Sequence, residues 1–317
     1  MNDLGRLLKP ASLVRIVLLY LVFMGLYATE VRAQDKGWAN WVLVTAGTTV
    51  VMTVATVAAI AVIVVIGRGG LLASQAARLR TAGKTEQALA RYNEAVARNP
   101  NSAEALLGRA EILADTGRPA DALADLDRAI TLTPHVSNFP DPALGRAYLD
   151  RTRLRVASGD LDGAVNDGTQ AIRAAPGQAE PYIMRGRAYL DRGDWLQGRS
   201  DLASGIHLLD RKLGGRPRDA SQQAADFNTR GLAYDLLGDH THALADYEAA
   251  LQADPKLWSA HYNLGAAYLA LGHTDAALAA LTQAIALNPA AAAAARTSAG
   301  YAPLRGQTEF DALVRMF

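Results

Sequence analysis

Apolar residues are distributed unevenly along the 317 residues of the chain. They concentrate in residues 13–66, whereas from Gly67 onward small and charged residues alternate with apolar ones at helical spacing. The pattern therefore predicts a chain that divides near residue 67. An apolar N-terminal part precedes a long helical part, and the fold class is all-α.

The stretch 42–66 contains no charged side chain over 25 residues. As an α-helix it would be roughly 37 Å long, which exceeds the ~30 Å hydrocarbon core of a bilayer. Trp38 and Trp41 stand at its start, where aromatic rings favour the membrane interface. Many of its residues are β-branched, but a lone strand in lipid leaves its backbone unpaired. The pattern therefore predicts a tilted transmembrane helix over about 41–66.

A shorter apolar stretch covers residues 12–29, if Arg15 extends its charge towards the membrane surface. Two interpretations stay open. The stretch is either a short transmembrane span or a signal sequence, in which Arg6 and Lys9 precede the apolar run and "VRA" at 31–33 offers a cleavage site. Residues 1–68 are thus predicted to be a membrane anchor, and whether residues 1–33 are removed stays undecided.

The helical part repeats itself with a period of 34 residues. In every window position 8 is small, position 15 is glycine, and positions 20 and 27 are alanine or glycine. Small residues let two helices touch, and the glycine ends the first helix with a left-handed cap. Proline at position 32, present in five of the six windows, stops the second helix. The windows are 69–102, 103–136, 145–178, 179–212, 224–257 and 258–291.

Window four departs from this pattern. It carries Asp210 in place of the proline, and Gly198 and Gly205 replace alanine in its second helix. Inserts of eight and eleven residues follow windows two and four. We expect these two joints to bend or widen the stack of hairpins.

Two charged positions are coupled within the windows. Position 7 is arginine and position 23 is aspartate in windows two to five, and both are missing together from windows one and six. Residues that are gained and lost as a pair are expected to be in contact, and an arginine at a packed helix interface is costly without a carboxylate. We therefore predict bridges across each hairpin rather than a basic ladder that reads a ligand. The pairs are Arg109 with Asp125, Arg151 with Asp167, Arg185 with Asp201, and Arg230 with Asp246.

The windows resemble the tetratricopeptide repeat family. The clearest matches are "FNTRGLAYDLLGDHTHALADYEAALQADP" (227–255) and "YNLGAAYLALGHTDAALAALTQAIALNP" (262–289). The resemblance covers residues 69–291 and implies an α-solenoid of six helix hairpins, a right-handed superhelix with a concave groove.

Residues 292–317 lie outside the windows and are predicted to form a C-terminal capping helix, because a terminal repeat otherwise exposes its core side. A partner-binding tail is the alternative. The residues expected on the apolar face of this helix are Tyr301, Leu304, Phe310, Leu313 and Phe317.

In this family the groove is lined chiefly by positions 2, 5, 9, 12 and 13 of each first helix. The resemblance thus implies a protein partner, bound as an extended peptide or a helix. These positions carry both signs of charge here, with an acidic patch in window two facing a basic one in window three. The lysine and asparagine set with which some members clamp a terminal carboxylate is not seen at the matching positions. The candidates are Arg80, Glu104, Leu107, Glu111, Asp115, Arg146, Leu149, Arg153, Glu180, Ile183, Arg187, Asp191, Asn228, Asp235 and Tyr262.

Composition narrows the range of functions. The net charge is +1, from 32 basic and 31 acidic residues mixed along the chain, so no basic stripe indicates nucleic acid. The absence of cysteine excludes disulfides and thiolate chemistry. No phosphate loop, nucleophile elbow or HExxH motif occurs. His240 and His242 are close in sequence but lack a third ligand. The sequence predicts no enzyme, cofactor or metal, and an enzyme or metal-dependent regulator using this turn is the disfavoured alternative.

Basic residues flank both predicted spans on the same side, with three before the first and four after the second, against two between them. By the positive-inside rule both ends are cytoplasmic. We predict an adaptor in a bacterial-type inner membrane, an accessory subunit or assembly factor that contacts lipid and an integral membrane complex. An envelope-biogenesis factor with its repeats in the periplasm stays open. The sequence specifies neither the partner nor the oligomeric state.

Overall fold

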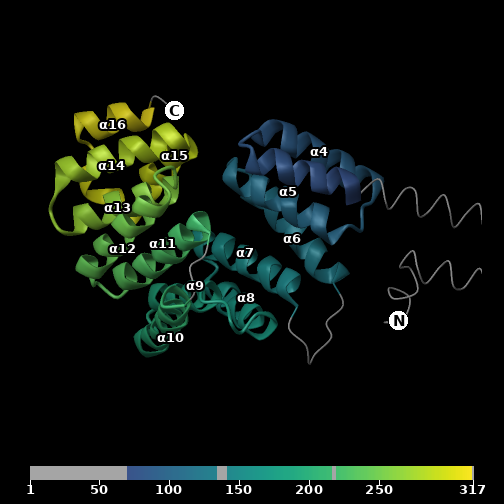
Figure 1. The fold of residues 1–317 in the computed structure, drawn as a ribbon, viewed down its shortest axis with the longest axis horizontal. Coiled ribbons are helices and arrows are strands. Elements are labelled where there is room, and N and C mark those ends of the chain that lie inside the picture. Colours follow the sequence, from purple (N-terminus) through teal and green to yellow (C-terminus); the bar gives the residue numbers. More distant parts are fainter. Residues whose placement is uncertain (1–69, 134–140, 216–218, 316–317) are drawn as a thin grey trace, which may run out of the picture. The chain divides into compact units, whose positions relative to one another are not determined.

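The computed structural model describes residues 70–133, 141–215 and 219–315, and within these ranges every regular element is helical (Figure 1). The chain divides into two compact units, Met1–Gly108 and Arg109–Phe317. The predicted spans at about 12–29 and 41–66 lie outside the described residues. Among the helices that the structure does describe, none combines the length and apolar character needed to cross a bilayer.

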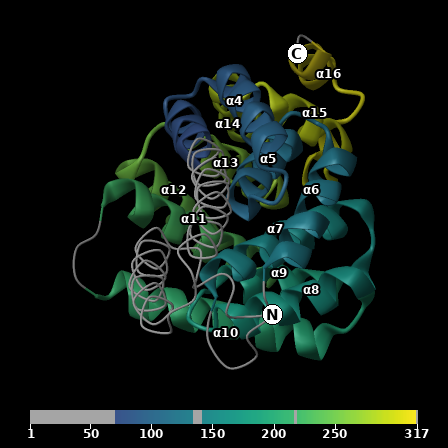
Figure 2. The ribbon, with the colours of Figure 1, turned by 90° about the vertical axis from the view of Figure 1, so that its right-hand side faces the viewer.

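The helices follow one another in pairs joined by short turns. In the first unit, residues 70–81 are helical and precede α4 (Thr85–Arg98) and the start of α5 (Ala103–Asp115). Successive helices of the second unit pack against one another, as Figure 2 shows for α7 to α10. Its further helices are α6 (Pro119–Leu132), α7 (Pro142–Ser158), α8 (Leu161–Ala174), α9 (Glu180–Arg192), α10 (Trp195–Leu213), α11 (Ala220–Leu236), α12 (His240–Ala253), α13 (Trp258–Ala270), α14 (Thr274–Leu287), α15 (Ala290–Thr297), the 3₁₀ helix η1 (Ala299–Leu304) and α16 (Thr308–Arg315).

Glycine and proline set the ends of these helices. At position 15 the glycine follows the first helix with φ between +72° and +92°, a left-handed conformation that other residues rarely adopt. In repeats one, two, three, five and six the second helix ends two residues before the proline of position 32. Repeat four, with Asp210 instead, has a second helix of 19 residues that continues to Leu213. One missing proline therefore accounts for the longest second helix.

The two inserts are partly helical. The side chain of Asp141 accepts hydrogen bonds from the backbone N–H groups of Ala143 and Leu144, at 3.0 and 3.1 Å, so α7 begins inside the first insert. Helix α11 begins at Ala220, also within an insert. Both first helices are 17 residues long, whereas α5, α9 and α13 have 13.

Small side chains mark the closest helix contacts. The alanines at positions 20 and 27 are fully buried in the repeats that carry them. In repeat four a Cβ on Gly198 would come within 2.6 Å of the Leu190 side chain, and one on Gly205 within 2.6 Å of Ile183. Helix α10 therefore lies so close to α9 that only glycine fits at these two positions.

The predicted Arg–Asp pairs form bidentate ion pairs in all four hairpins. Each guanidinium donates through Nε and Nη2 to the two carboxylate oxygens, at 2.7 to 2.8 Å. Hydrogen bonds to Asp125 and Asp246 raise the pKa values of Arg109 and Arg230 above their ordinary range. The aspartate side chains are only 2 to 11% exposed, so each bridge holds a nearly buried charge.

Three of these arginines also reach the preceding repeat. The third guanidinium nitrogen, Nη1, donates to Asp127 on α6 from Arg151 at 2.6 Å and to Asp210 on α10 from Arg230 at 2.7 Å. In Arg185 it donates to the Thr169 hydroxyl on α8 at 3.0 Å. Each of these three bridges therefore joins the two helices of its own hairpin and also the second helix before it.

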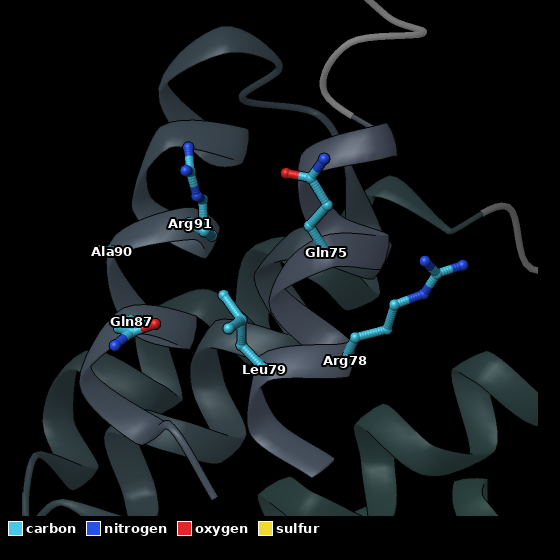
Figure 3. Close-up of a pocket in the computed structure, with 6 residues that line it drawn as sticks. All are labelled: Gln75, Arg78, Leu79, Gln87, Ala90 and Arg91. Carbon is cyan, nitrogen blue, oxygen red and sulfur yellow. The ribbon is translucent and has the colours of Figure 1, made fainter. Parts of the chain in front are cut away.

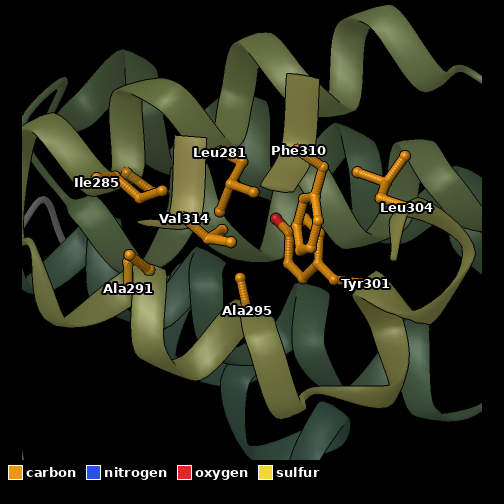
Figure 4. Close-up of a cluster of buried hydrophobic side chains, with 10 residues drawn as sticks. Leu281, Ile285, Ala291, Ala295, Tyr301, Leu304, Phe310 and Val314 are labelled. Atoms are coloured by element: carbon orange, nitrogen blue, oxygen red, sulfur yellow. The ribbon is translucent and has the colours of Figure 1, made fainter. Parts of the chain in front are cut away.

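The C-terminal segment covers the last hairpin with three short elements rather than one helix. Ser298 caps η1, Pro303 lies within it, and Gly306 has φ of +84°, so a continuous helix over 292–317 is wrong. Even so, the segment buries an apolar cluster against α14 (Figure 4). Tyr301, Leu304 and Phe310 are buried, with Leu313 partly buried, while Phe317 lies outside the described residues. Val314, not expected from the sequence, is buried in the same cluster.

Tyr301 links the C-terminal segment to α13, the first helix of repeat six. Its hydroxyl donates to the backbone carbonyl of Tyr262 at 2.7 Å. A Cβ on Gly265, at the small position 8, would approach the Tyr301 hydroxyl oxygen to 2.3 Å. The small residue of the last repeat therefore makes room for the cap.

Removing one bridge partner should destabilise the second unit strongly. In Arg230→Met the buried Asp246 loses both hydrogen bonds, and we expect a loss of roughly 3–5 kcal/mol in the free energy of unfolding. The double variant Arg230→Met/Asp246→Leu should recover most of that loss, because no buried charge is left alone. Urea denaturation followed by circular dichroism measures both. Arg211→Met, an exposed arginine on α10, is the control, and equal losses in it and Arg230→Met would contradict the assigned role.

Truncation of the cap should loosen the last repeat selectively. Phe310→Ala removes a buried ring from the cluster on α14, and such truncations cost about 3–5 kcal/mol. Hydrogen exchange should show faster exchange of the α13 and α14 amides, with α7 and α8 unchanged. Glu309→Ala, on the exposed side of α16, should leave all four helices protected. Uniform loss of protection through the second unit would rule out a local cap.

Candidate partner-binding surface

The first helices of successive repeats lie side by side in the second unit. Helix α7 contacts α9, α9 contacts α11, and α11 contacts α13. An ion pair between Glu111 on α5 and Arg146 on α7 links the first two. We call the solvent-exposed side of these five helices the first-helix face. It carries most of the candidate residues in unit two.

Six charged side chains on this face form the inner charge cluster: Glu111 and Asp115 on α5, Arg146, Asp150 and Arg153 on α7, and Glu180 on α9. Arg146 pairs with Glu111 and lies 4.0 Å from Asp150. Arg153 donates to Asp150 at 2.6 Å and also pairs with Glu180. The cluster thus spans three consecutive repeats.

The cluster is negative overall, with four carboxylates against two guanidinium groups. Desolvation lowers the pKa of Arg153, but Glu180, Asp150 and Asp115 outweigh it and raise the pKa above its ordinary value. The side chains of Arg146, Arg153 and Glu180 are 40 to 54% exposed. The Arg153–Glu180 pair is exposed on both side chains, and exposed ion pairs contribute only ~0–1 kcal/mol, so a partner's charge can replace it at little cost.

Glu111, from the predicted acidic patch of window two, forms an ion pair with Arg146, from the predicted basic patch of window three. Farther along the face, Arg187 lies 3.6 Å from Asp191 within α9. Burial raises the pKa of Tyr262 above its ordinary value, and the positive charge of Arg187 lowers this pKa by a smaller amount.

Two further candidates are engaged in local contacts. Asn228 accepts a hydrogen bond from Asn263 on α13 at 3.0 Å, so it links two first helices. Asp235 lies 2.6 Å from the Nδ1 atom of His240. Both side chains are half-buried.

Three predicted lining residues are not on the surface. Leu107, Leu149 and Ile183, all at position 5, are buried, with at most 8% of each residue exposed. They are apolar, and Ile183 faces Gly205 on the second helix of its own hairpin, so position 5 belongs to the core here. Arg80 is half-buried and Glu104 exposed, and both belong to the first unit, apart from the inner charge cluster.

Asp150, which contacts Arg146 and Arg153 on α7, was not among the residues predicted from the sequence. It stands at position 6, outside the positions expected to line a groove. Its spacing of four residues from Arg146 and three from Arg153 is the helical spacing at which opposite charges meet, and that pattern could have identified it. The exposed apolar pair Trp195 and Leu196, at the start of α10, was missed too, and no pattern in the sequence distinguished it from a buried pair.

The two histidines in the first turn of α12 do not converge on one point. His240 pairs with Asp235, whereas His242 pairs with Asp239 at 2.7 Å and stacks on Tyr234. Over the described ranges, no group of three or more His, Asp or Glu side chains is arranged to hold a metal ion. The arrangement can bind charged groups of a partner.

Three segments match family models of the tetratricopeptide repeat: residues 74–137, 231–272 and 258–290. Superkiller complex protein 3 of Homo sapiens is 48% identical over 60 residues, and its Mus musculus counterpart is 45% identical over the same length. That match covers 19% of this chain and 4% of those much longer relatives.

Solved structures share the fold. A tetratricopeptide repeat protein from Parabacteroides merdae superimposes with a TM-score of 0.51 at 16% identity, covering 78% of this chain and 83% of that one. The APC/C hetero-tetramer Cut9–Hcn1 gives a TM-score of 0.50 at 14% identity, covering 77% of this chain and 42% of that one. Together with the helix hairpins and their glycine and proline positions, these likenesses show the all-α fold of tetratricopeptide repeats, and residues 74–137 and 231–290 match such repeats in sequence as well.

Proposed function

We propose that this protein is a membrane-anchored scaffold that holds a partner protein on the first-helix face. The observation that carries the proposal is the inner charge cluster, in which three successive first helices present charged groups already held in position. Prepositioned side chains lose little conformational entropy on binding. The excess of carboxylates favours a peptide or helix that brings lysine or arginine, with acidic residues placed opposite Arg146 and Arg153.

Tetratricopeptide repeats typically act as non-enzymatic scaffolds, which supports binding rather than catalysis. The names of the similar proteins point the same way. Superkiller complex protein 3 and Cut9 with Hcn1 are named as parts of protein assemblies. We infer that this chain likewise works in an assembly, as an accessory subunit or assembly factor of a membrane complex.

The membrane part of the proposal is supported by the sequence. The 25 uncharged residues at 42–66 are long enough to span a bilayer and stop just before the first repeat. The basic residues that flank the two apolar stretches favour a cytoplasmic repeat domain in a bacterial-type inner membrane.

A charge reversal in the inner charge cluster should release the partner. Glu180→Lys reverses the charge of the α9 residue that pairs with Arg153. Asp275→Lys makes the same kind of reversal in the first turn of α14, outside the cluster. Purification of both variants in mild detergent, followed by quantitative mass spectrometry, should show a stoichiometric companion of the wild type retained with Asp275→Lys and reduced roughly tenfold with Glu180→Lys. Recovery of the wild-type chain alone would count against a scaffold.

Fractionation should test the anchor and its orientation. We expect the protein to remain in the membrane pellet after alkaline carbonate extraction, because a spanning helix is not displaced by high pH. The repeats should resist protease added to intact spheroplasts and be digested after lysis. Digestion in intact spheroplasts would place them outside and favour the envelope-biogenesis alternative. Release by carbonate would contradict the anchor itself.

A further inference from the structure

Three of the four bridged hairpins present a face on which a preceding helix packs. Arg151, Arg185 and Arg230, all at position 7, donate to α6, α8 and α10, which are the second helices of the repeats before them. Two of these contacts go to position 25 of the preceding repeat, at Asp127 and Thr169. The side of a repeat that carries positions 7 and 23 is therefore a helix-binding side.

The corresponding side of repeat one holds an open pocket of about 530 Å³ (Figure 3). Gln75 and Arg91 occupy positions 7 and 23 in this repeat. Five of the six lining residues are exposed, and Leu79 is half-buried. The residues that line the pocket are Gln75, Arg78 and Leu79 from residues 70–81, and Gln87, Ala90 and Arg91 from α4.

An exposed apolar side chain extends this surface. Leu71 is 59% exposed and lies four residues, about one helical turn, before Gln75, so it continues the pocket side of the helix. Leu79 points into the space between the two helices in Figure 3. The surface thus has apolar side chains flanked by polar ones, a pattern that suits the binding of an amphipathic helix.

The charge at position 23 of repeat one is opposite in sign to that of the bridged repeats. Position 23 is aspartate in repeats two to five and arginine here, and the exposed Arg91 shares Glu94 with Arg98, at 2.9 and 2.7 Å. Residues 70–98 contain five basic and two acidic side chains. In repeats three and five the arginine at position 7 pairs with a carboxylate on the preceding helix. In repeat one the arginine on this side is Arg91, which lies on the second helix.

We propose that this pocket side of repeat one binds an acidic amphipathic helix of a partner protein, in the place that a preceding second helix occupies in the other repeats. A carboxylate near position 25 of that helix would pair with Arg91, and its apolar residues would cover Leu71 and Leu79. The stretch 42–66 of this chain is uncharged and supplies no such carboxylate. The surface uses none of the residues of the inner charge cluster, so it stands independently of the proposed function.

A peptide probe tests this assignment. The probe is a fluorescent, helix-stabilised peptide with the sequence of α6, residues 119–132, because that helix carries three aspartates and one arginine and brings Asp127 to Arg151. Its binding to the purified full-length chain in detergent is followed by fluorescence anisotropy. We expect saturable binding that Arg91→Glu weakens by about tenfold.

Two controls make the result specific. Lys84→Glu reverses an exposed charge just before α4, outside the pocket, and should leave affinity nearly unchanged. A peptide carrying Asp127→Lys should bind the wild type weakly and regain affinity for Arg91→Glu. Equal weakening by Lys84→Glu, failure of this charge exchange, or no saturable binding would each overturn the proposal. Concentration-dependent self-association that Arg91→Glu abolishes would also overturn it, because the occupant would then be a second copy.

Discussion

The bidentate Arg–Asp bridge is the interaction on which the second unit depends. A guanidinium has five N–H donors in a fixed plane, and here two of them serve one carboxylate across the hairpin while a third reaches back in three of the repeats. One side chain therefore fixes both the pairing of two helices and the place of the previous one. Apolar contacts alone would tolerate sliding, whereas a planar fork accepts one register.

Ion pairs between arginine and a carboxylate have different consequences depending on how deeply they are buried. In the bridges the aspartates are nearly buried, so their pairing must be complete and leaves no capacity for a ligand. On the first-helix face both side chains of the Arg153–Glu180 pair are partly in water, where the pair is weak and replaceable. Burial, rather than residue type, separates the charges that hold the fold from those available to a partner.

Much of the fold was predictable because backbone effects act locally. A left-handed glycine and a proline impose their conformations almost regardless of context, so hairpin ends, and the long α10 that lacks its proline, follow from the residues themselves. The bridges were also predictable, because two residues that appear and disappear together within one chain report a contact. The segment after α14 was harder to predict, since Ser298, Pro303 and Gly306 interrupt a pattern that otherwise resembles one helix.

The binding surface was predictable only in outline. Which side of a first helix faces solvent depends on its own second helix and on its neighbours, and Leu107, Leu149 and Ile183 turned out to face inward for that reason. Asp150 became part of the inner charge cluster through contacts along α7 that the repeat positions do not describe. Neither the spans at 12–29 and 41–66 nor Phe317 belong to the described residues, so those predictions stay as they were.

The bridges are missing from the first and the sixth repeat, and this gives the array soft ends and a stiff middle. Pulled from its termini, such an array would open from the outside inwards, because the outer hairpins lack the buried Arg–Asp pairs that the middle ones must also break. If the repeats are tethered at their N-terminus, a pulling force would thus unfold the outer hairpins first. The inner charge cluster between them would keep its structure.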